Sequence, residues 1–256
     1  MDGPVLVTGG TGTLGRAVVS RLREAGTAYR VLSRRGGDGV VVGDLASGAG
    51  VDDAVRGATT ILHLASGPRH DVALTRTLVD AARHASRVGH DRPHLVYISI
   101  VGVDRVPLGY YRQKLAGEGL VAGSGLPWTT LRATQFHNLL DALFTSASRI
   151  GVLPVLAGAV FQPVDVHDVA ARLVELAAAE PAGRVLQLGG PAVRPMDELA
   201  RVWLRARGRR RRVLALPLPG RLASAVRAGG LTAPDQPRGT GTFEQYLGSR
   251  APDARA

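Results

Sequence analysis

The first 135 residues alternate short apolar runs with longer stretches in which apolar and polar positions recur at helical spacing. The apolar runs are uninterrupted, which is typical of strands in a parallel sheet that helices cover on both faces. The predicted strands are Val5–Thr8, Tyr29–Ser33, Val40–Val42, Thr60–Leu64, His94–Ser99 and Trp128–Arg132. The predicted helices between them are Leu14–Ala25, Val51–Arg56, Asp71–Arg87 and Tyr110–Gly123. This order of elements indicates an α/β fold with a doubly wound parallel sheet.

Beyond Thr134 the pattern is looser. We expect helices over Phe136–Arg149, Asp165–Ala179 and Met196–Arg207, strands over Arg184–Leu188 and Val213–Leu216, and loops over the Pro- and Gly-rich segments Gly151–Gly158 and Gly229–Gly241. One of Asp165, His167 and Asp168 is expected to cap the helix that they precede. No linker divides the chain, so we expect a single domain: a core of about 1–135 plus 159–190, and a small C-terminal lobe of about 136–158 and 191–256.

Composition narrows the function classes. The chain has 256 residues, 45% of them hydrophobic and 21% charged, as a folded α/β domain requires. It has no cysteine, which excludes disulfides, thiolate metal sites and cysteine nucleophiles. No run approaches the roughly 20 apolar residues of a membrane span. Because the N-terminal residues enter a strand without a basic leader, we expect a cytoplasmic protein.

The formal net charge of +11 first suggests a polyanionic partner. However, Lys114 is the only lysine among 32 basic residues, and such an arginine excess is typical of coding bias in a GC-rich genome. Aromatic residues make up 4% of the chain, too few for the stacking platforms of single-strand binders. The arginine-rich segment 205–212 could grip phosphate but is more typical of a solvated helix end. We therefore expect a small-molecule substrate, with no nucleic acid and no membrane as partner; whether the chain forms a homo-oligomer stays open.

A glycine-rich turn follows the first predicted strand and opens the first helix. Gly9, Gly12 and Gly15 stand at three-residue intervals. The first allows a tight turn, the second a close approach of the backbone to a pyrophosphate, and the third close packing of the helix on the sheet. The anion would lie on the free N–H groups at the helix start. This context predicts a Rossmann-type dinucleotide site that includes Thr11, Thr13 and Leu14.

The end of the second strand indicates which dinucleotide binds. An NAD site uses an acidic residue there to hold the ribose 2′-hydroxyl, whereas Ser33, Arg34 and Arg35 occupy these positions here. Arginine fits a 2′-phosphate bidentately, so the sequence favours NADP(H); the alternative is two solvated arginines. The turns after the third and fourth strands add candidate cofactor contacts: Asp44, Leu45, Leu64, Ala65 and Ser66.

Candidate catalytic residues follow the fifth strand. Ser99 ends that strand at the carboxyl edge, where ligands of doubly wound sheets bind. Tyr110 and Lys114 are four residues apart and share a helix face. A nearby ammonium would favour the phenolate of the tyrosine for acid–base work, while the serine holds a substrate carbonyl. Tyr111 is an alternative to Tyr110 as the acid. The non-catalytic alternative is a surface helix on which the lysine is incidental.

The chain resembles the atypical, NmrA-like NAD(P)H-binding branch of the short-chain dehydrogenases/reductases. The residues that carry the resemblance are Thr8-Gly9-Gly10-Thr11-Gly12-x-x-Gly15, Ser99, Tyr110-x-x-x-Lys114, Glu118, and the segments Trp128–Phe136, Pro163–Ala170 and Gly241–Leu247. The resemblance implies that Lys114 contacts the nicotinamide ribose and that Tyr110 is the proton donor. One departure is that the helix Asp71–Arg87 lacks the asparagine of the main branch; Asn138 is the only asparagine in the chain.

The combined expectation is an NADPH-dependent reductase of a carbonyl or quinone-like small molecule, with a C-terminal substrate lobe. Two alternatives keep the same fold: a redox-sensing regulator that binds NADP(H) without turnover, and a non-redox tailoring enzyme such as an isomerase or cyclase. His90 and His94 near Asp91 invite a metal site, but no third ligand lies at a useful spacing. We therefore expect no metal.

Overall fold

Seven strands form the central sheet within the part of the chain that the computed structural model describes, residues 3–87, 92–236 and 239–250. Their order is β3-β2-β1-β4-β5-β6-β9. The pairs β1–β2, β1–β4, β2–β3 and β4–β5 are parallel. The strands are β1 (Val5–Thr8), β2 (Tyr29–Ser33), β3 (Val40–Val42), β4 (Thr60–His63), β5 (His94–Ile100), β6 (Trp128–Ala133) and β9 (Val185–Leu188).

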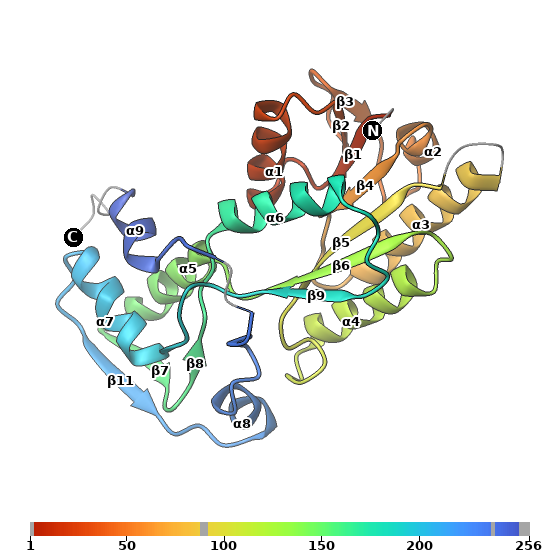
Figure 1. Cartoon of the computed structure of the whole chain (residues 1–256). Coiled ribbons are helices and arrows are strands. Elements are labelled where there is room, and N and C mark those ends of the chain that lie inside the picture. Colours follow the sequence, from red (N-terminus) through yellow and green to blue (C-terminus); the bar gives the residue numbers. More distant parts are fainter. Residues whose placement is uncertain (1–2, 88–91, 237–238, 251–256) are drawn as a thin grey trace. The chain divides into compact units, whose positions relative to one another are not determined.

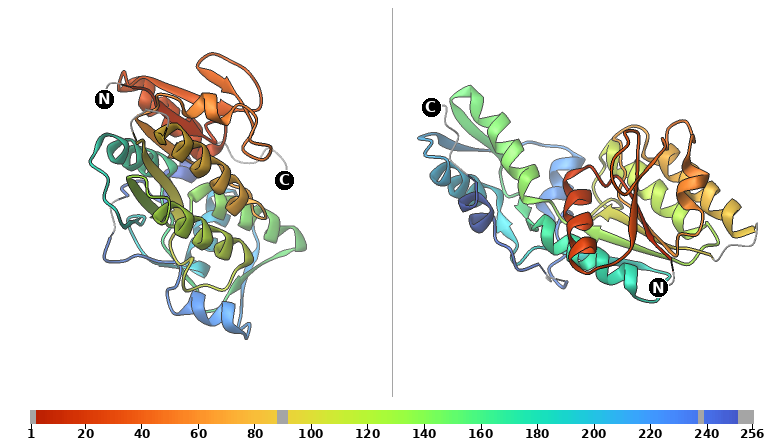
Figure 2. Two further views of the ribbon diagram at one scale, coloured as in Figure 1. Left: turned by 90° about the vertical axis from the view of Figure 1, so that its right-hand side faces the viewer. Right: turned by 90° about the horizontal axis from the view of Figure 1, so that it is seen from above.

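Helices cover both faces of this sheet. In Figures 1 and 2, α1 and α6 lie on one side of the strands and α2, α3 and α4 on the other. These helices are α1 (Thr13–Glu24), α2 (Val51–Val55), α3 (Asp71–Arg87), α4 (Gly109–Ala122) and α6 (Val166–Ala178). The arrangement confirms the predicted Rossmann-type, doubly wound α/β fold.

Coverage on both sides explains why the strands are uninterrupted apolar runs. Every residue of β1 and of β4 is buried. Helix α3 instead buries one face, with Leu78 and Ala82 in the core. The polar residues that end β1 and β4 hydrogen-bond to each other: Thr8 Oγ1 lies 2.7 Å from His63 Nδ1. The polar side chains that end β1 and β4 are thus satisfied internally.

The chain forms two compact units. The first comprises Met1–Ser99, Gly109–Arg132 and Val169–Leu186. The second comprises Ile100–Leu108, Ala133–Asp168 and Gln187–Ala256. The glycine-rich turn, Ser99, Tyr110 and Lys114 all belong to the first unit. A role for the C-terminal residues as a substrate lobe stays a prediction.

The second unit contains small sheets and helices around an aromatic core. Phe144 and Trp203 are fully buried there, with ring centroids 6.0 Å apart. Asp165, directly before α6, accepts a hydrogen bond from the His167 N–H at 2.7 Å, as predicted for a helix cap. The remaining elements are α5 (His137–Ala147), η1 (Ser148–Ile150), β7 (Val152–Leu156), β8 (Val160–Phe161), β10 (Arg194–Pro195), α7 (Met196–Ala206), β11 (Arg212–Leu216), α8 (Arg221–Arg227) and α9 (Phe243–Gly248).

The prediction of a loop over Gly151–Gly158 is wrong. Residues Val152–Leu156 form β7, which pairs in parallel with β11. Leu153 and Val155 are buried, and this alternation marks a strand with one covered face. Pro154 is tolerated because β7 belongs to a two-stranded sheet and so has a free edge. Helices α8 and α9 were also not predicted; a capping box between Thr242 and Gln245 begins α9.

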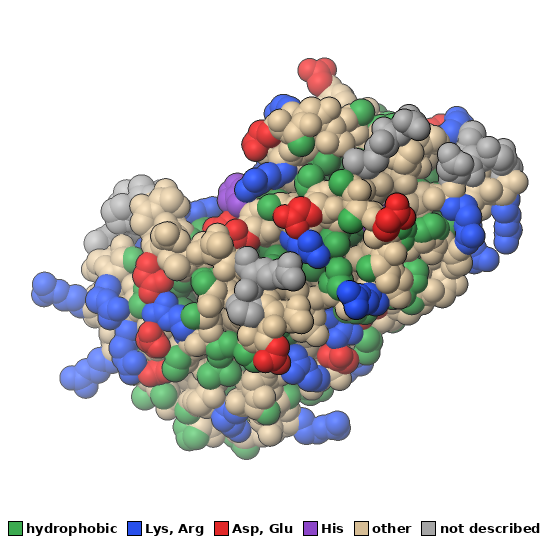
Figure 3. All heavy atoms as spheres, viewed as in Figure 1, with side chains coloured by type: hydrophobic (Ala, Val, Ile, Leu, Met, Phe, Trp, Pro, Cys, Tyr) green, Lys and Arg blue, Asp and Glu red, His purple; other side chains and the backbone are tan. Residues whose placement is uncertain are grey.

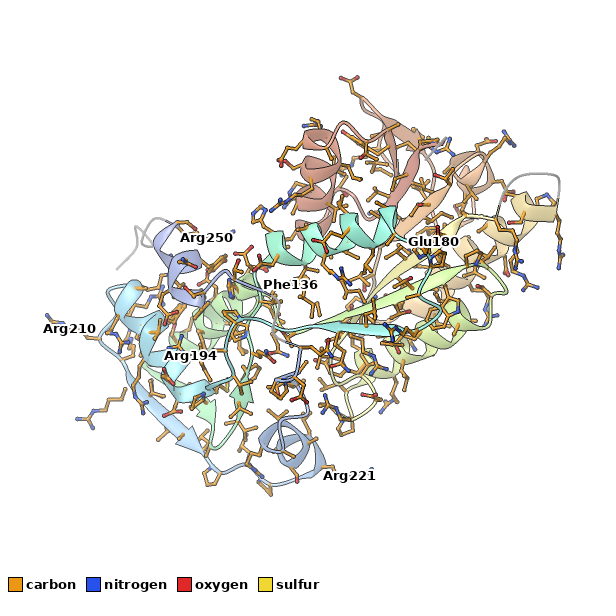
Figure 4. All side chains as sticks on the ribbon, viewed as in Figure 1. Phe136, Glu180, Arg194, Arg210, Arg221 and Arg250 are labelled. Atoms are coloured by element: carbon orange, nitrogen blue, oxygen red, sulfur yellow. The ribbon has the colours of Figure 1, made fainter. Side chains whose placement is uncertain are left out.

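The arginine-rich segment 205–212 runs from the end of α7 to the first residue of β11. Figure 4 shows the side chain of Arg210 extending away from the fold, while Arg207 donates to Asp141 Oδ2 at 2.7 Å and Arg209 to Ser148 Oγ at 2.9 Å. On the face shown in Figure 3, basic side chains occur at many separate places with acidic ones among them. No helix within the described residues is long and apolar enough to cross a membrane.

Candidate functional site

The glycine-rich turn between β1 and α1 lies where the strand order reverses, the position at which doubly wound sheets bind ligands. Gly9 has a φ of 70°, and its carbonyl accepts the Gly12 N–H at 3.0 Å. A Cβ on Gly15 would overlap the carbonyl oxygen of Gly9, so only glycine lets α1 begin this close to the turn. Gly12 stands at the N-cap and supplies no side-chain acceptor, which leaves the first N–H groups of α1 available to an anion.

A cavity of about 490 Å³ opens beside this turn. Its volume lies within the usual range of small-molecule and cofactor sites. The structure brings most of the predicted cofactor residues together in its lining: Gly9, Thr11, Gly12, Ser33, Arg34, Asp44, Leu45, Leu64, Ala65 and Ser66. The uncapped helix start and this lining fit a dinucleotide, whose phosphates would lie on Gly12 and the first turn of α1.

Other predicted cofactor residues lie outside the lining. Thr13, Leu14 and Gly15 form the first turn of α1, and Leu14 and Gly15 are buried. Arg35 is exposed and its backbone N–H donates to Ser33 Oγ at 3.3 Å. Lys114 is buried at a different place, described below.

The lining also includes residues that the sequence analysis did not name: Leu32, Gly43, Ala46, Gly67, His70 and Leu74. Four of them are chain neighbours of predicted residues and could have been added by adjacency. His70 directly precedes α3 and Leu74 lies in its first turn, and the approach of that helix leaves no signal in the sequence. Asp44 is the only carboxylate among the described lining residues, and its Oδ1 accepts the Ala46 N–H at 2.9 Å.

Ser66 connects this cavity to Tyr110. Its Oγ lies 2.6 Å from Tyr110 Oη and donates to Asp71 Oδ1 at 2.7 Å. Tyr111, the alternative acid, is buried, and burial raises its pKa to about 12. Among the side-chain hydrogen bonds of the described residues, one involves the hydroxyl of Tyr110 and none that of Tyr111.

Asp71, at the start of α3, is the centre of a buried polar cluster. It is 1% exposed, and Tyr97 Oη donates to its Oδ2 at 2.6 Å. The Lys114 ammonium lies 3.4 Å from its Oδ1. Burial works to raise the pKa of Asp71, but the charge of Lys114 and the hydrogen bonds from Tyr97 and Ser66 outweigh it, so this pKa lies below its usual value.

Lys114 directs its ammonium into this cluster. Besides its contact with Asp71, its Nζ donates to the Ile98 carbonyl at 3.0 Å and to Tyr97 Oη at 3.2 Å. An ammonium has three protons, so these partners use all of its donors. The expected approach of Lys114 to the hydroxyl of Tyr110 is not among the contacts of the described residues. Burial lowers the pKa of Lys114, against the opposing effect of Asp71.

The pKa of Tyr110 is raised rather than lowered. Burial is the main cause, and the negative charge of Asp71 adds to it, while a hydrogen bond donated by Ser66 to the phenol oxygen would act in the opposite direction. This differs from the expected phenolate-favouring ammonium because the charge of Lys114 is compensated by Asp71. At neutral pH the hydroxyl of Tyr110 is therefore protonated.

Ser99 and His94 lie in the buried part of β5. Ser99 is 2% exposed, and its Oγ has no hydrogen-bond partner among the described residues. Its hydroxyl is thus a buried donor that the described residues leave unsatisfied. His94 is buried with Nε2 2.9 Å from Thr129 Oγ1, while His90 and Asp91 lie outside the described residues. No group of three or more His, Asp or Glu side chains suited to a metal ion occurs in the described part of the chain.

A protein-family model described as NAD(P)H-binding matches residues 9–180, which include the turn, the cavity lining and Lys114. The chain belongs to this NAD(P)H-binding family. The match confirms the resemblance to the atypical short-chain dehydrogenases/reductases.

Relatives in this family include named reductases. The chain is 32% identical over 199 residues to a (4-alkanoyl-5-oxo-2,5-dihydrofuran-3-yl)methyl phosphate reductase of Streptomyces griseus, a match that covers 73% of this chain and 68% of the relative. It is 25% identical over 217 residues to quinone oxidoreductase 2 of Escherichia coli, covering 77% and 72%. A solved structure of an NADPH-dependent quinone oxidoreductase from Escherichia coli with NADPH has the same fold: the TM-score is 0.81, the identity 21%, and the coverage 96% of this chain and 99% of that one.

Proposed function

We propose that this protein is an NADPH-dependent oxidoreductase that reduces a carbonyl or quinone-like small molecule. The observation that carries the proposal is the position of Ser66, which lines the cavity at the glycine-rich turn and also contacts the hydroxyl of Tyr110 at 2.6 Å. A cofactor in this cavity and the protonated hydroxyl of Tyr110 would then adjoin each other within the first unit. The reductase names of the relatives support the same reaction class.

The cavity residues suit NADPH. Gly9, Gly12 and the start of α1 would hold the pyrophosphate. Ser33 and Arg34 line the cavity at the end of β2, where a hydroxyl and a guanidinium would hold a 2′-phosphate. NADPH supplies a hydride to the acceptor when it is bound.

The remaining chemistry belongs to the side chains. Ser99 would donate its unpartnered hydroxyl to the acceptor oxygen and orient it. Tyr110 would turn its single hydroxyl proton from Ser66 Oγ to that oxygen and give it up as the oxygen becomes negatively charged; the phenol O–H bond breaks as the product O–H bond forms. Lys114 would act on neither the ribose nor Tyr110 directly, because Asp71, Tyr97 and Ile98 use its protons.

Two measurements test the proposal. Loss of NADPH absorbance is followed with a panel of quinones, ketones and lactones; substrate-dependent oxidation is expected. Calorimetric titration should show NADPH binding about 10- to 100-fold tighter than NADH, the effect of a charge-assisted bidentate contact. Tight NADPH binding without oxidation of any acceptor would instead identify a redox-sensing protein, and equal affinities would contradict the role of Ser33 and Arg34.

A further inference from the structure

A chain of hydroxyl groups connects Tyr110 to a buried carboxylate. Tyr110 Oη lies 2.6 Å from Ser66 Oγ, which lies 2.7 Å from Asp71 Oδ1. Asp71 is ionised and can only accept, whereas the serine hydroxyl has a single proton. Ser66 must therefore donate to Asp71 and accept from Tyr110. The geometry fixes the direction of both hydrogen bonds.

Residues on each element that packs around Asp71 keep its carboxylate ionised and in place. Lys114 on α4 supplies the counter-charge, and Tyr97 on β5 donates from the opposite side at 2.6 Å. His63 on β4 is neutral, because burial lowers its pKa to about 3. Within α3 itself the Asp71 carbonyl accepts Thr75 Oγ1 at 2.8 Å. The carboxylate is thus fixed in position and keeps its charge at neutral pH.

We propose that Asp71, acting through Ser66, is the positioning residue that holds the hydroxyl proton of Tyr110 on its phenol oxygen, and that Lys114 serves Asp71 rather than Tyr110. This inference rests on the proposed function, in which Tyr110 is the proton donor. It gives a role to an aspartate of α3, the helix that lacks the asparagine of the main branch, and the sequence analysis did not single out this residue.

The arrangement has a chemical consequence. When Tyr110 gives its proton to the acceptor oxygen, a phenolate faces Ser66 and the charge of Asp71 behind it. Two negative charges so close favour rapid return of a proton from water to the phenolate, which restores the acid for the next turnover. The same charges make the phenolate rare at neutral pH, so an oxidation that begins from it is favoured only in alkaline solution.

Direct titration of Tyr110 tests the hydrogen-bonded series Tyr110–Ser66–Asp71 without the need for turnover. The chain has five tyrosines, so tyrosinate absorbance is recorded for each protein and for its Tyr110→Phe counterpart, and the difference isolates Tyr110. Asp71→Asn should lower the midpoint by about 1–3 pH units, because the negative charge is lost and the Lys114 ammonium remains. Ser66→Ala, which leaves the Asp71–Lys114 pair intact, should lower it by about 0.4–1 pH unit, because the phenol loses its acceptor.

The sign of the second shift is decisive. If Ser66 donated to Tyr110 instead, Ser66→Ala would raise the midpoint, and an unchanged or raised midpoint in either folded variant overturns the proposal. Tyr97→Phe is the matched control, since it removes a hydrogen bond to Asp71 Oδ2 and leaves the chain to Tyr110 intact; its midpoint should stay close to the parent. When the parent oxidises NADPH, the alkaline limb of its pH–rate profile should move with the titration. If the midpoint of Tyr110 shifts as expected but the protein oxidises NADPH with no acceptor, the proposed function is refuted while the hydrogen-bonded series Tyr110–Ser66–Asp71 is supported.

Discussion

Tyr110 and Tyr111 are neighbours on α4, yet their hydroxyl groups have different surroundings. Tyr110 contacts Ser66 at the cavity, and Tyr111 is buried. We expect Tyr110→Phe to lower the single-turnover rate of NADPH oxidation by about 10²–10⁴-fold, the usual contribution of a positioned general acid. NADPH affinity should stay nearly unchanged, since Tyr110 is not among the cavity-lining residues.

Tyr111→Phe is the matched control, because it removes the neighbouring hydroxyl and keeps the ring contacts. Its rate should stay within a few-fold of the parent, although burial raises the pKa of this tyrosine as well. Equal losses in the two variants would show that the proton does not pass through Tyr110.

Lys114 and Asp71 depend on each other for their charges. Lys114→Met leaves a buried carboxylate without a counter-charge, which should lower the free energy of unfolding by about 3–5 kcal/mol. In the double variant with Asp71→Asn no buried charge is unpaired, so its loss should be smaller than the sum of the two single losses. Urea unfolding of the parent, both single variants and the double variant measures the coupling; additive losses would show that the two side chains do not interact.

At the scale of elements, the approach of α4 to β5 places Lys114 and Tyr110. A Cβ on Gly117 would lie 2.5 Å from Tyr97 Oη, so a side chain there would push the helix from the strand. We expect Gly117→Ala to lower the free energy of unfolding by about 1–3 kcal/mol, the usual cost of overpacking. Gly119→Ala on the same helix has open space around it and should instead raise stability by up to about 1 kcal/mol. Denaturant unfolding of both variants checks this pair, and a stabilised Gly117→Ala would contradict the close packing.

The strands of the first unit could be predicted because both of their faces are covered. The predicted strand Thr60–Leu64 ends one residue beyond the observed β4, and β1 and β2 agree with the prediction. Strand β7 was missed because Pro154 and the flanking glycines are typical of a loop, and because its partner β11 lies far away in the sequence. Such a pairing depends on contacts that no local pattern records.

The candidate site also contains residues that the local sequence predicts and residues that only tertiary packing places there. The glycine-rich turn could be predicted because its geometry depends on residues within one short segment. Asp71 could not, since an acidic residue in the first turn of a helix is typical of a surface position. Its burial follows from the packing of α3 on α4, and the same packing turns Lys114 towards it.

At the scale of the whole molecule, the response to acid depends on histidines that fold in their neutral form. His63 is fully buried, and the Thr8 hydroxyl lies 2.7 Å from its Nδ1 and the Thr75 hydroxyl 3.1 Å from its Nε2. Thr8 Oγ1 accepts the Ala65 N–H and Thr75 Oγ1 donates to the Asp71 carbonyl, so the ring accepts at Nδ1 and donates at Nε2. A second proton on the ring would face the Thr8 hydroxyl and lie close to the Lys114 charge.

Stability should therefore fall as the pH drops below about 6.5, the usual value for a histidine in the unfolded chain. Burial lowers the pKa of His63 to about 3 and that of His94 to about 4 in the folded protein. At a pH between the pKa of a histidine in the folded protein and about 6.5, the unfolded chain binds a proton that the folded protein does not. In this range each histidine lowers the free energy of unfolding by about 1.4 kcal/mol for each unit by which the pH drops. From pH 7 to pH 5 each should remove about 2 kcal/mol. Urea unfolding across this range should show a shallower slope than the parent in His63→Gln and the full slope in His84→Gln, whose side chain is exposed. If His63→Gln kept the full parent slope, His63 would not be the group that couples acid to unfolding.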